Sequence, residues 1–461
     1  MTWERGRNLN WKFKMLDVII VGAGFSGIAA ARKLHQANKA FLVLEARNRI
    51  GGRVYTKQFP ENLYLDLGGQ WIGSSQTRMY ELCEEYQINL FETYNKGYNI
   101  LEINGQIRKY KGLIPKMNLL SLLNLDWVLK KLDRMAKKIT VSDPWNHPKA
   151  KVLDQTKLSD FISKYCLTKE SHQVVKYALE TVLAIELSKI SLLHALFYIK
   201  SGHSLQALIS IKDGAQQHRA EGGMQLLAEK MAALFKDQIR FGHAVTSIIQ
   251  NEESVTVQGE NFSFSCKKVI MAVPPPLIND IRFSPELSTL KKQIISGIYM
   301  GKVGKCFMVY QKPFWRENDF SGQALADEDS PFQTMFDSSP NDGGYGIILG
   351  FTIADRAEEY FRKPEAKRKQ LMLEKLHSYF GEEALQPIMY QDIYMTDEAW
   401  SQGCYAGIYP LGAWTGFQNT YVKPEGNIFW AGTESSDQWY GYIEGAVRAG
   451  ERAVGELGME D

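Results

Sequence analysis

A glycine-rich stretch near the N-terminus, "VIIVGAGFSGIAAARKL", is the first candidate for chemistry. Gly22, Gly24 and Gly27 form the pattern GxGxxG between an apolar run and an alanine-rich run. In a strand–turn–helix unit such glycines allow a tight turn, close approach of the backbone to a pyrophosphate and close helix packing. The helix N-terminus adds free N–H groups and positive potential. Glu45 follows at the offset where an acid binds a ribose hydroxyl, so the pattern predicts a dinucleotide site.

Three further glycine turns indicate which dinucleotide is bound. The segment "ARNRIGGRV" adds a second phosphate-facing turn with the cation Arg53. The segment "YLDLGGQWIG" places Gly69 where a flat ring could approach the backbone, and "FWAGTES" adds a turn at Gly432. An NAD enzyme needs only the first turn. A longer cofactor that crosses the domain would use all of them, so the set favours FAD.

Cys404 lies in "WSQGCYAGIYP", between a glycine and a tyrosine, with aromatic residues on both sides. From the residue alone it could be a small buried hydrophobe, a metal ligand, a redox thiol or an attachment point. The chain has five cysteines and no CxxC pair, which favours a reducing compartment over a disulfide framework. We therefore expect a cytoplasmic protein. The eight histidines form no HExxH motif, so no metal site is expected.

The composition is that of a globular protein. The 461 residues are 44% hydrophobic and 23% charged, and their number suggests more than one domain. The formal net charge of +2 argues against a nucleic-acid binder. No apolar run approaches the ~20 residues that span a bilayer, so no integral membrane segment is expected. The runs "KKLDRMAKK" and "RKPEAKRKQ" are interpreted as solvated helix faces. Residues 1–14 lack a secretory signal, and they are either a loose extension or precede a true start at Met15.

The elements that position these residues follow two patterns. Residues 16–21 form a β-branched apolar strand, residues 26–34 form a helix, and a second buried strand ends at Glu45, which makes a βαβ unit. Residues 112–210 are mostly helical, whereas residues 237–283 return to short strands.

This order predicts an α/β plus α+β protein in which a mixed substrate-binding domain is inserted into a discontinuous Rossmann-like FAD-binding domain. The predicted ranges are 1–90, 211–295 and 400–461 for the FAD-binding domain, and 91–210 and 296–399 for the substrate-binding domain.

Several segments together resemble the flavin amine oxidases of the monoamine oxidase family. In family order they are "VIIVGAGFSGIAAARKL", "VLEARNRIGGRV", "DLGGQWIG", "VPPPLI", "GKVGKCFMVYQKPFWR", "WSQGCYAGIYP" and "FWAGTESSDQWYGYIEGAVRAGERA". The glycine-rich segments are shared by many flavoenzymes, whereas "GCY" together with "GYIEGAV" is much more specific. The resemblance implies an FAD enzyme that converts a primary amine, O2 and water to an aldehyde, ammonia and hydrogen peroxide.

The resemblance also implies roles for individual residues. Cys404 would carry the flavin through a thioether, and Lys305, on a strand at 303–310, would hold a water near the flavin. Tyr405 and Tyr442 would form an aromatic cage that orients the amine. Lys302 lies at opposite strand parity to Lys305, so the two side chains should face opposite sides.

Looser matches assign the rest of the pocket. Ile209 and Gln216 resemble substrate-contacting residues, with Gln217 as the neighbouring alternative, while Trp439 and Tyr440 differ from the usual residues of the far wall. The residues that the resemblance places against the cofactor are Gly22, Gly24, Gly27, Glu45, Arg47, Gly52, Arg53, Gly69, Gln70, Trp71, Val245, Trp400, Cys404, Gly432, Thr433, Glu434 and Tyr442.

Alternative functions remain open from the sequence. A diamine or polyamine oxidase of the putrescine type would be favoured by an acidic residue in the pocket. An L-amino-acid oxidase would need an arginine for the substrate carboxylate, and a non-catalytic flavoprotein would not need Lys305 or the two tyrosines. The chain ends at Asp461 without the hydrophobic tail of the mitochondrial enzymes, so no anchor is expected; a homodimer is a further expectation.

Overall fold

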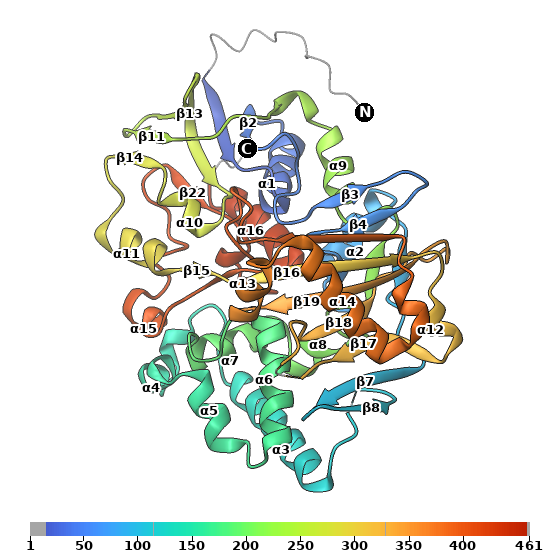
Figure 1. Ribbon diagram of the computed structural model, residues 1–461. Helices are drawn as coiled ribbons and strands as arrows, with labels where there is room; N and C mark the ends of the chain where they lie inside the picture. Colours follow the sequence, from blue (N-terminus) through green and yellow to red (C-terminus); the bar gives the residue numbers. More distant parts are fainter. Residues whose placement is uncertain (1–14, 114, 328, 459–461) are drawn as a thin grey trace.

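The computed structural model describes residues 15–113, 115–327 and 329–458, so the expectation for residues 1–14 lies outside the described residues. Its first large sheet is built around β1, which is apolar and almost fully buried (Figure 1). β1 pairs in parallel with β2 and with β13, as the predicted βαβ unit requires. In spatial order the strands are β10 (Ile239–Arg240), β2 (Phe41–Leu44), β1 (Leu16–Val21), β13 (Phe262–Met271), β12 (Val255–Gly259), β11 (Ser247–Gln250) and β14 (Arg282–Ser284), and β22 (Ile428–Trp430) also pairs with β13.

Helices from both ends of the chain cover this sheet. α1 spans Phe25–Gln36, which confirms the predicted helix and extends it at both ends, and α16 (Ile443–Gly455) packs against it. β2 ends at Leu44, one residue before the predicted end at Glu45. The C-terminal helix therefore belongs with the first βαβ unit, as Figure 1 shows. Neighbouring helices are α2 (Thr77–Glu85), α9 (Gln225–Ala233), α10 (Pro275–Ile278) and α11 (Thr289–Gly297).

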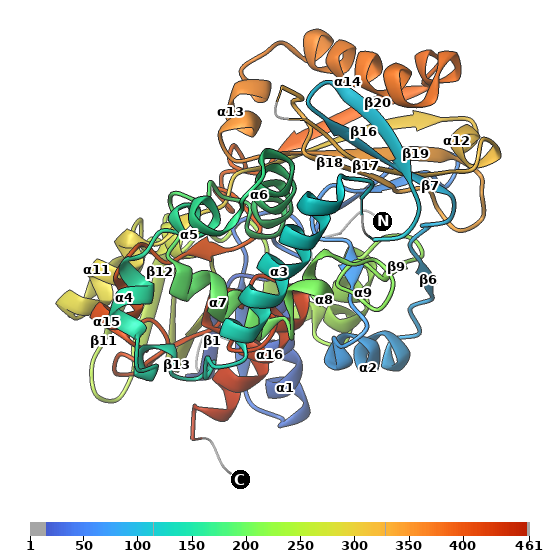
Figure 2. The ribbon, with the colours of Figure 1, turned by 90° about the horizontal axis from the view of Figure 1, so that it is seen from below.

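The second large sheet lies on the other side of the molecule from β1. Its strands in spatial order are β20 (Met389–Tyr394), β16 (Val303–Tyr310), β19 (Gly346–Ile353), β18 (Thr334–Asp337), β17 (Phe320–Leu325), β7 (Tyr98–Ile103) and β8 (Gln106–Tyr110). β16 matches the predicted strand at 303–310. α14 (Glu365–Phe380) packs on one face, together with α12 (Phe314–Glu317) and α13 (Asp355–Phe361) nearby (Figure 2).

The side chains of β16 alternate between the two faces, because successive strand residues point to opposite sides. Cys306 and Met308 pack with the helix-covered face, whereas Phe307 packs with Leu65 and Cys404 on the inner face. Lys305 therefore points inward, toward the first sheet.

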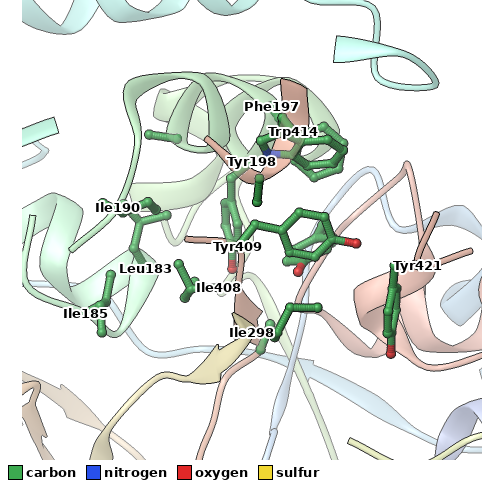
Figure 3. Close-up of a cluster of buried hydrophobic side chains, with 14 of the residues drawn as sticks. Leu183, Ile185, Ile190, Phe197, Tyr198, Ile298, Ile408, Tyr409, Trp414 and Tyr421 are labelled. Carbon is green, nitrogen blue, oxygen red and sulfur yellow. The ribbon is translucent and has the colours of Figure 1, made fainter. Parts of the chain in front are cut away.

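The segment predicted to be helical, 112–210, is helical and covers one end of the second sheet (Figure 2). α7 is apolar on all sides and is buried, as expected for a core helix. Its Phe197 and Tyr198 join Tyr409 and Trp414 in an aromatic cluster, shown in Figure 3. The helices are α3 (Leu119–Ala136), α4 (Ala150–Gln155), α5 (Leu158–Tyr165), α6 (Lys169–Leu183), α7 (Leu192–Ser201) and α8 (Leu205–Ile209).

Short elements complete the chain: β3 (Thr56–Gln58), β4 (Tyr64–Asp66), β5 (Trp71–Ile72), β6 (Leu90–Glu92), β9 (His218–Ala220), β15 (Tyr299–Met300), β21 (Gly407–Ile408) and α15 (Ala413–Phe417). The first sheet draws its strands only from the ranges expected for the FAD-binding domain, and the second sheet only from the ranges expected for the substrate-binding domain. The domain boundaries themselves remain our interpretation. None of the helices in the described ranges has the length and apolarity needed to cross a membrane.

Candidate active site

A cavity of about 840 Å³ lies between the two large sheets and takes lining residues from both. Its volume is in the upper part of the range typical of small-molecule and cofactor sites. The cavity wall includes fifteen residues expected to contact a cofactor: Gly22, Gly24, Glu45, Arg47, Gly52, Arg53, Gly69, Gln70, Trp71, Val245, Trp400, Cys404, Gly432, Thr433 and Tyr442. Gly27 and Glu434 do not line it; Gly27 packs on the Gly22 turn and Glu434 pairs with Arg53.

The glycine turn after β1 shows why these positions must be glycine. Gly22 has φ +104°, a conformation that side-chain-bearing residues rarely adopt. A Cβ on Gly27 would lie 1.9 Å from the Gly22 carbonyl oxygen, so only glycine lets α1 pack on the turn. The carboxylate of Glu45, just beyond β2, accepts hydrogen bonds from the backbone N–H groups of Ala23 (2.7 Å) and Arg47 (2.9 Å). Strand, turn and acid are thus held together at one end of the cavity.

Lys305 is buried at the centre of the site. Its Nζ donates to the carbonyl oxygens of Asp66 (2.5 Å) and Gly68 (2.8 Å) and to Oε1 of Gln70 (2.6 Å). These three acceptors match the three donors of an ammonium group. Burial nevertheless lowers the pKa of Lys305 to about 7, so the side chain titrates near neutral pH. Lys302 lies just before β16 and pairs with Glu358, away from the cavity.

Two buried donors near Lys305 lack partners in the described part of the chain. They are Nε2 of Gln70 and Nε1 of Trp71, both on residues that line the cavity. Because buried polar groups are nearly always hydrogen-bonded, these donors fit a polar molecule bound against the 68–71 segment. Glycines on three turns leave room beside them, which suits a long, flat cofactor such as a flavin dinucleotide.

A buried ion pair between Arg53 and Glu434 links the glycine turn at residues 51–53 to the backbone of Tyr405. Arg53 Nη1 donates to Oε1 of Glu434 (2.6 Å) and to the backbone oxygen of Tyr405 (2.8 Å). Glu434 also accepts from the backbone N–H of Gly407 (2.9 Å). Arg53 holds the pKa of the Glu434 carboxyl below its usual value despite burial. Glu434 therefore fixes the 405–407 backbone rather than facing the cavity.

Cys404 lies on the cavity wall and is buried, with a cis peptide bond to Tyr405. Burial raises the pKa of its thiol to about 12, so the protonated thiol dominates at neutral pH. Its reactivity toward a bound group would depend on position and access, as expected from the sequence. Trp400 lines the same part of the wall.

Tyr405 and Tyr442 both line the cavity, and burial raises the pKa of both hydroxyls. The Tyr442 ring lies 6.2 Å from Tyr198 and 4.9 Å from Trp439 between centroids. Trp439 and Tyr440, whose types left the far wall open in the sequence, are buried in the core and do not line the cavity: the Tyr440 hydroxyl donates to the Gly407 carbonyl (2.6 Å). They support the tyrosine pair from behind.

Ile209 and Gln216 line the cavity beyond the tyrosines, whereas Gln217 does not. Gln216 Nε2 donates to the Leu208 carbonyl (3.1 Å), and Gln217 Oε1 accepts from the backbone of Asp213 (2.9 Å). The structure thus separates two neighbours that the sequence left ambiguous.

We expect Gln216→Ala to raise the KM for amines by up to about tenfold, because the change removes one hydrogen-bonding group from the cavity wall. Gln217→Ala, the matched control, should leave KM unchanged. Steady-state kinetics on both variants check this, and equal effects would show that Gln216 does not contact the substrate.

Many residues of the substrate end were not assigned from the sequence. They come from α6 and from strands of the second sheet, and they are mainly apolar: Val174, Ala178, Thr181, Val182, Gln323, Leu325, Thr334, Met335, Phe336 and Phe351. No motif marks them, because their common feature is that they face one cavity from separate elements. They could have been identified only by knowing which face of each helix or strand meets the cavity.

Carboxylates are scarce around the cavity. Among the described residues its lining includes three: Glu45 in the glycine-turn region, Asp280 beside α10, and Asp213 on an exposed loop. None of the three belongs to the wall formed by α6 and the second sheet, whereas Asp213 lies in the loop between Ile209 and Gln216.

A dinucleotide cradle joined to an apolar pocket with two tyrosines and a buried lysine defines the class of a flavin-dependent amine oxidase. Residues 25–457 match the family described as flavin containing amine oxidoreductase, and the chain belongs to this family.

Named relatives agree with this assignment. The chain is 34% identical over 450 residues to amine oxidase [flavin-containing] A of Equus caballus, covering 96% of this chain and 85% of that one. It is 35% identical over 445 residues to amine oxidase [flavin-containing] B of Mus musculus, covering 96% and 86%.

Solved structures confirm the fold class. The cyclohexylamine oxidase of Brevibacterium oxydans superposes with a TM-score of 0.93 at 29% identity, covering 96% of this chain and 99% of that one. Putrescine oxidase bound to putrescine superposes with a TM-score of 0.92 at 29% identity, with the same coverage. The protein is therefore a flavin-containing amine oxidase with a discontinuous Rossmann-like domain and an inserted mixed domain.

Proposed function

We propose that the protein uses FAD to convert a primary monoamine, O2 and water to an aldehyde, ammonia and hydrogen peroxide. One observation carries the proposal: Lys305, Tyr405 and Tyr442 line one cavity together with the glycine turns that suit a flavin dinucleotide. When bound, the flavin supplies the two-electron oxidation of the amine. The chain supplies position, orientation and exclusion of water.

The tyrosines orient the substrate. In this proposal the neutral amine lies between Tyr405 and Tyr442, and the apolar wall from α6 and the second sheet holds its side chain. Burial by aromatic rings excludes bulk water and favours the neutral form of the amine, which is the form that reacts. The core packing of Trp439 and Tyr440 keeps the two rings in place.

Lys305 positions the backbone segment against which we place the flavin ring. Its contacts with Asp66, Gly68 and Gln70 fix the segment against which we place the flavin ring. The water that we expect it to hold would replace one of these three contacts. Because its pKa is near 7, Lys305 can carry or release a proton at physiological pH.

A monoamine is favoured over a diamine because the wall that α6 and the second sheet contribute carries no carboxylate to pair with a second ammonium group, and Asp213, in the loop between Ile209 and Gln216, is exposed. The resemblance to putrescine oxidase keeps the diamine alternative testable. Peroxide release should be measured with matched substrates such as benzylamine, putrescine and an L-amino acid. We expect the highest kcat/KM for the monoamine; a higher value for putrescine would favour the alternative.

We further propose that Cys404 carries the flavin covalently through a thioether. The support is its place on the cavity wall beside Tyr405. Acid precipitation should then leave the wild-type protein yellow, while Cys404→Ala should release all its flavin into the supernatant. The matched control is Cys306→Ala, because Cys306 is a buried free cysteine on the helix-covered face of β16 and does not line the cavity. Release of flavin from the wild type would contradict the attachment.

The cytoplasmic location and the homodimer expected from the sequence belong to this proposal as well. The sparse cysteines, all free in the described structure, support a reducing compartment.

A further inference from the structure

α3 exposes a row of large apolar side chains that none of the described residues covers. Leu119, Leu120 and Leu123 are 72%, 68% and 62% exposed, and Trp127 on the same side is also exposed. At about 100° per residue these four positions fall within roughly 100° of the helix circumference. Single exposed leucines are ordinary, but a contiguous group on one helix face marks an interaction site.

The C-terminal half of the same helix face is basic. Lys130 and Arg134 continue the row, and Lys137 and Lys138 follow directly; we call all eight residues the α3 surface. Lys130 pairs with Asp126 (2.9 Å), but no ion pair joins Arg134, Lys137 or Lys138 to a carboxylate in the part of the chain that the structure describes.

The positive charge is concentrated around this helix. Residues 108–138 contain nine lysines and arginines and two aspartates, although the whole chain has a formal net charge of only +2. Leu167, from the loop beside α3, adds another exposed apolar side chain, held there by a hydrogen bond from its N–H to Asn124 (2.7 Å). Leucine and tryptophan beside lysine and arginine are the composition of helices that lie in the interface of an anionic membrane.

The opposite face of α3 belongs to the active-site cavity. Leu125 and Leu129 line the cavity, as do Gly112 and Leu113 in the loop that precedes the helix, and these two loop residues are exposed. The cavity therefore reaches the surface next to the α3 surface. Figure 1 and Figure 2 both place α3 on the outside of the helical region.

We propose that the α3 surface docks peripherally onto an anionic lipid bilayer, with the leucines and Trp127 inserted and the cations at the headgroups. A second copy of the chain is a poorer partner. A two-fold contact would bring the patch against itself, and its eight residues include no carboxylate to pair with the cations. If the proposed amine oxidation is correct, docking also lets apolar amines reach the cavity mouth from the bilayer.

The test is sedimentation of the full-length holoenzyme with vesicles of phosphatidylcholine alone or mixed with phosphatidylglycerol. This readout does not depend on amine oxidation, so failure of docking and failure of the proposed activity are distinguishable. We expect sedimentation with the anionic vesicles at low salt and weaker sedimentation as salt screens the charges.

Two variants and one control locate the contact. The triple change Arg134→Gln, Lys137→Gln and Lys138→Gln should lower vesicle partitioning at low salt about 100-fold, roughly fivefold per charge. The triple change Leu119→Ser, Leu120→Ser and Leu123→Ser should abolish sedimentation at any salt. The matched control changes three exposed leucines elsewhere, Leu234, Leu290 and Leu385, to serine and should bind as the wild type does.

Light scattering and thermal unfolding of each variant accompany the assay. Three results would overturn the proposal: no sedimentation of the wild type with anionic vesicles, equal sedimentation of the patch and control variants, or dissociation of a wild-type dimer by the leucine changes, which would assign the α3 surface to a second copy.

Discussion

Replacing Tyr405 or Tyr442 by alanine is expected to lower kcat/KM for a monoamine by about 10²-fold, the cost of losing the orientation of a reacting group. Each change removes one wall of the site where we place the amine. Replacement by phenylalanine keeps the ring. It should cost little at Tyr405, and somewhat more at Tyr442, whose hydroxyl lies against Tyr198.

The double alanine variant makes this prediction sharper. Because both rings align one nitrogen, the two effects should be less than additive. Rates are taken per bound flavin, from steady-state and stopped-flow kinetics, so that any loss of cofactor is separated from loss of orientation. Near-wild-type flavin reduction in both single alanine variants would place the substrate elsewhere in the cavity.

Replacing Lys305 by methionine is expected to slow reoxidation by O2 by about 10²-fold or more, the range for loss of a positioned proton donor or charge. Anaerobic reduction by the amine should change much less. Methionine keeps the length and apolar stem but loses the contacts with Asp66, Gly68 and Gln70.

The pH dependence gives a second readout for Lys305. Its pKa is lowered to about 7, so the ammonium form predominates below pH 7 and the neutral amine above it. If the ammonium assists reoxidation, the rate should fall as the pH rises through about 7, and the methionine variant should lack this transition. Lys302→Met, at the surface, is the control. A steep fall in anaerobic reduction with unchanged reoxidation would mean that the role is misassigned.

The sequence predicts the first sheet well and the second sheet poorly, for a physical reason. β1 is a continuous apolar run followed by a glycine turn and a helix, so its pattern is local and unambiguous. Of the seven-stranded sheet only β16 was predicted. β18 has four residues and β17 contains Gly322, and neither has a strong alternating pattern, so pairing with distant strands decides their structure.

The candidate site divides in the same way. The glycines and Glu45 follow from spacing, whereas Lys305 follows from the family resemblance, since strand parity shows only that Lys302 and Lys305 face opposite sides. Trp439 and Tyr440 left the far wall open in the sequence and are core residues, because Tyr440 packs on Phe197 of α7 and the Trp439 N–H donates to the Ser201 carbonyl of that helix. The apolar wall from α6 could not be predicted, since which face of a helix meets a cavity depends on tertiary packing.

The most direct test of the central claim is anaerobic mixing of the wild-type holoenzyme with a monoamine such as benzylamine. We predict that the flavin spectrum bleaches fully and that one aldehyde forms per flavin, because the amine is oxidised at the cavity lined by Tyr405, Tyr442 and Lys305. A flavin that stays oxidised with every monoamine, diamine and amino acid tested would contradict the account.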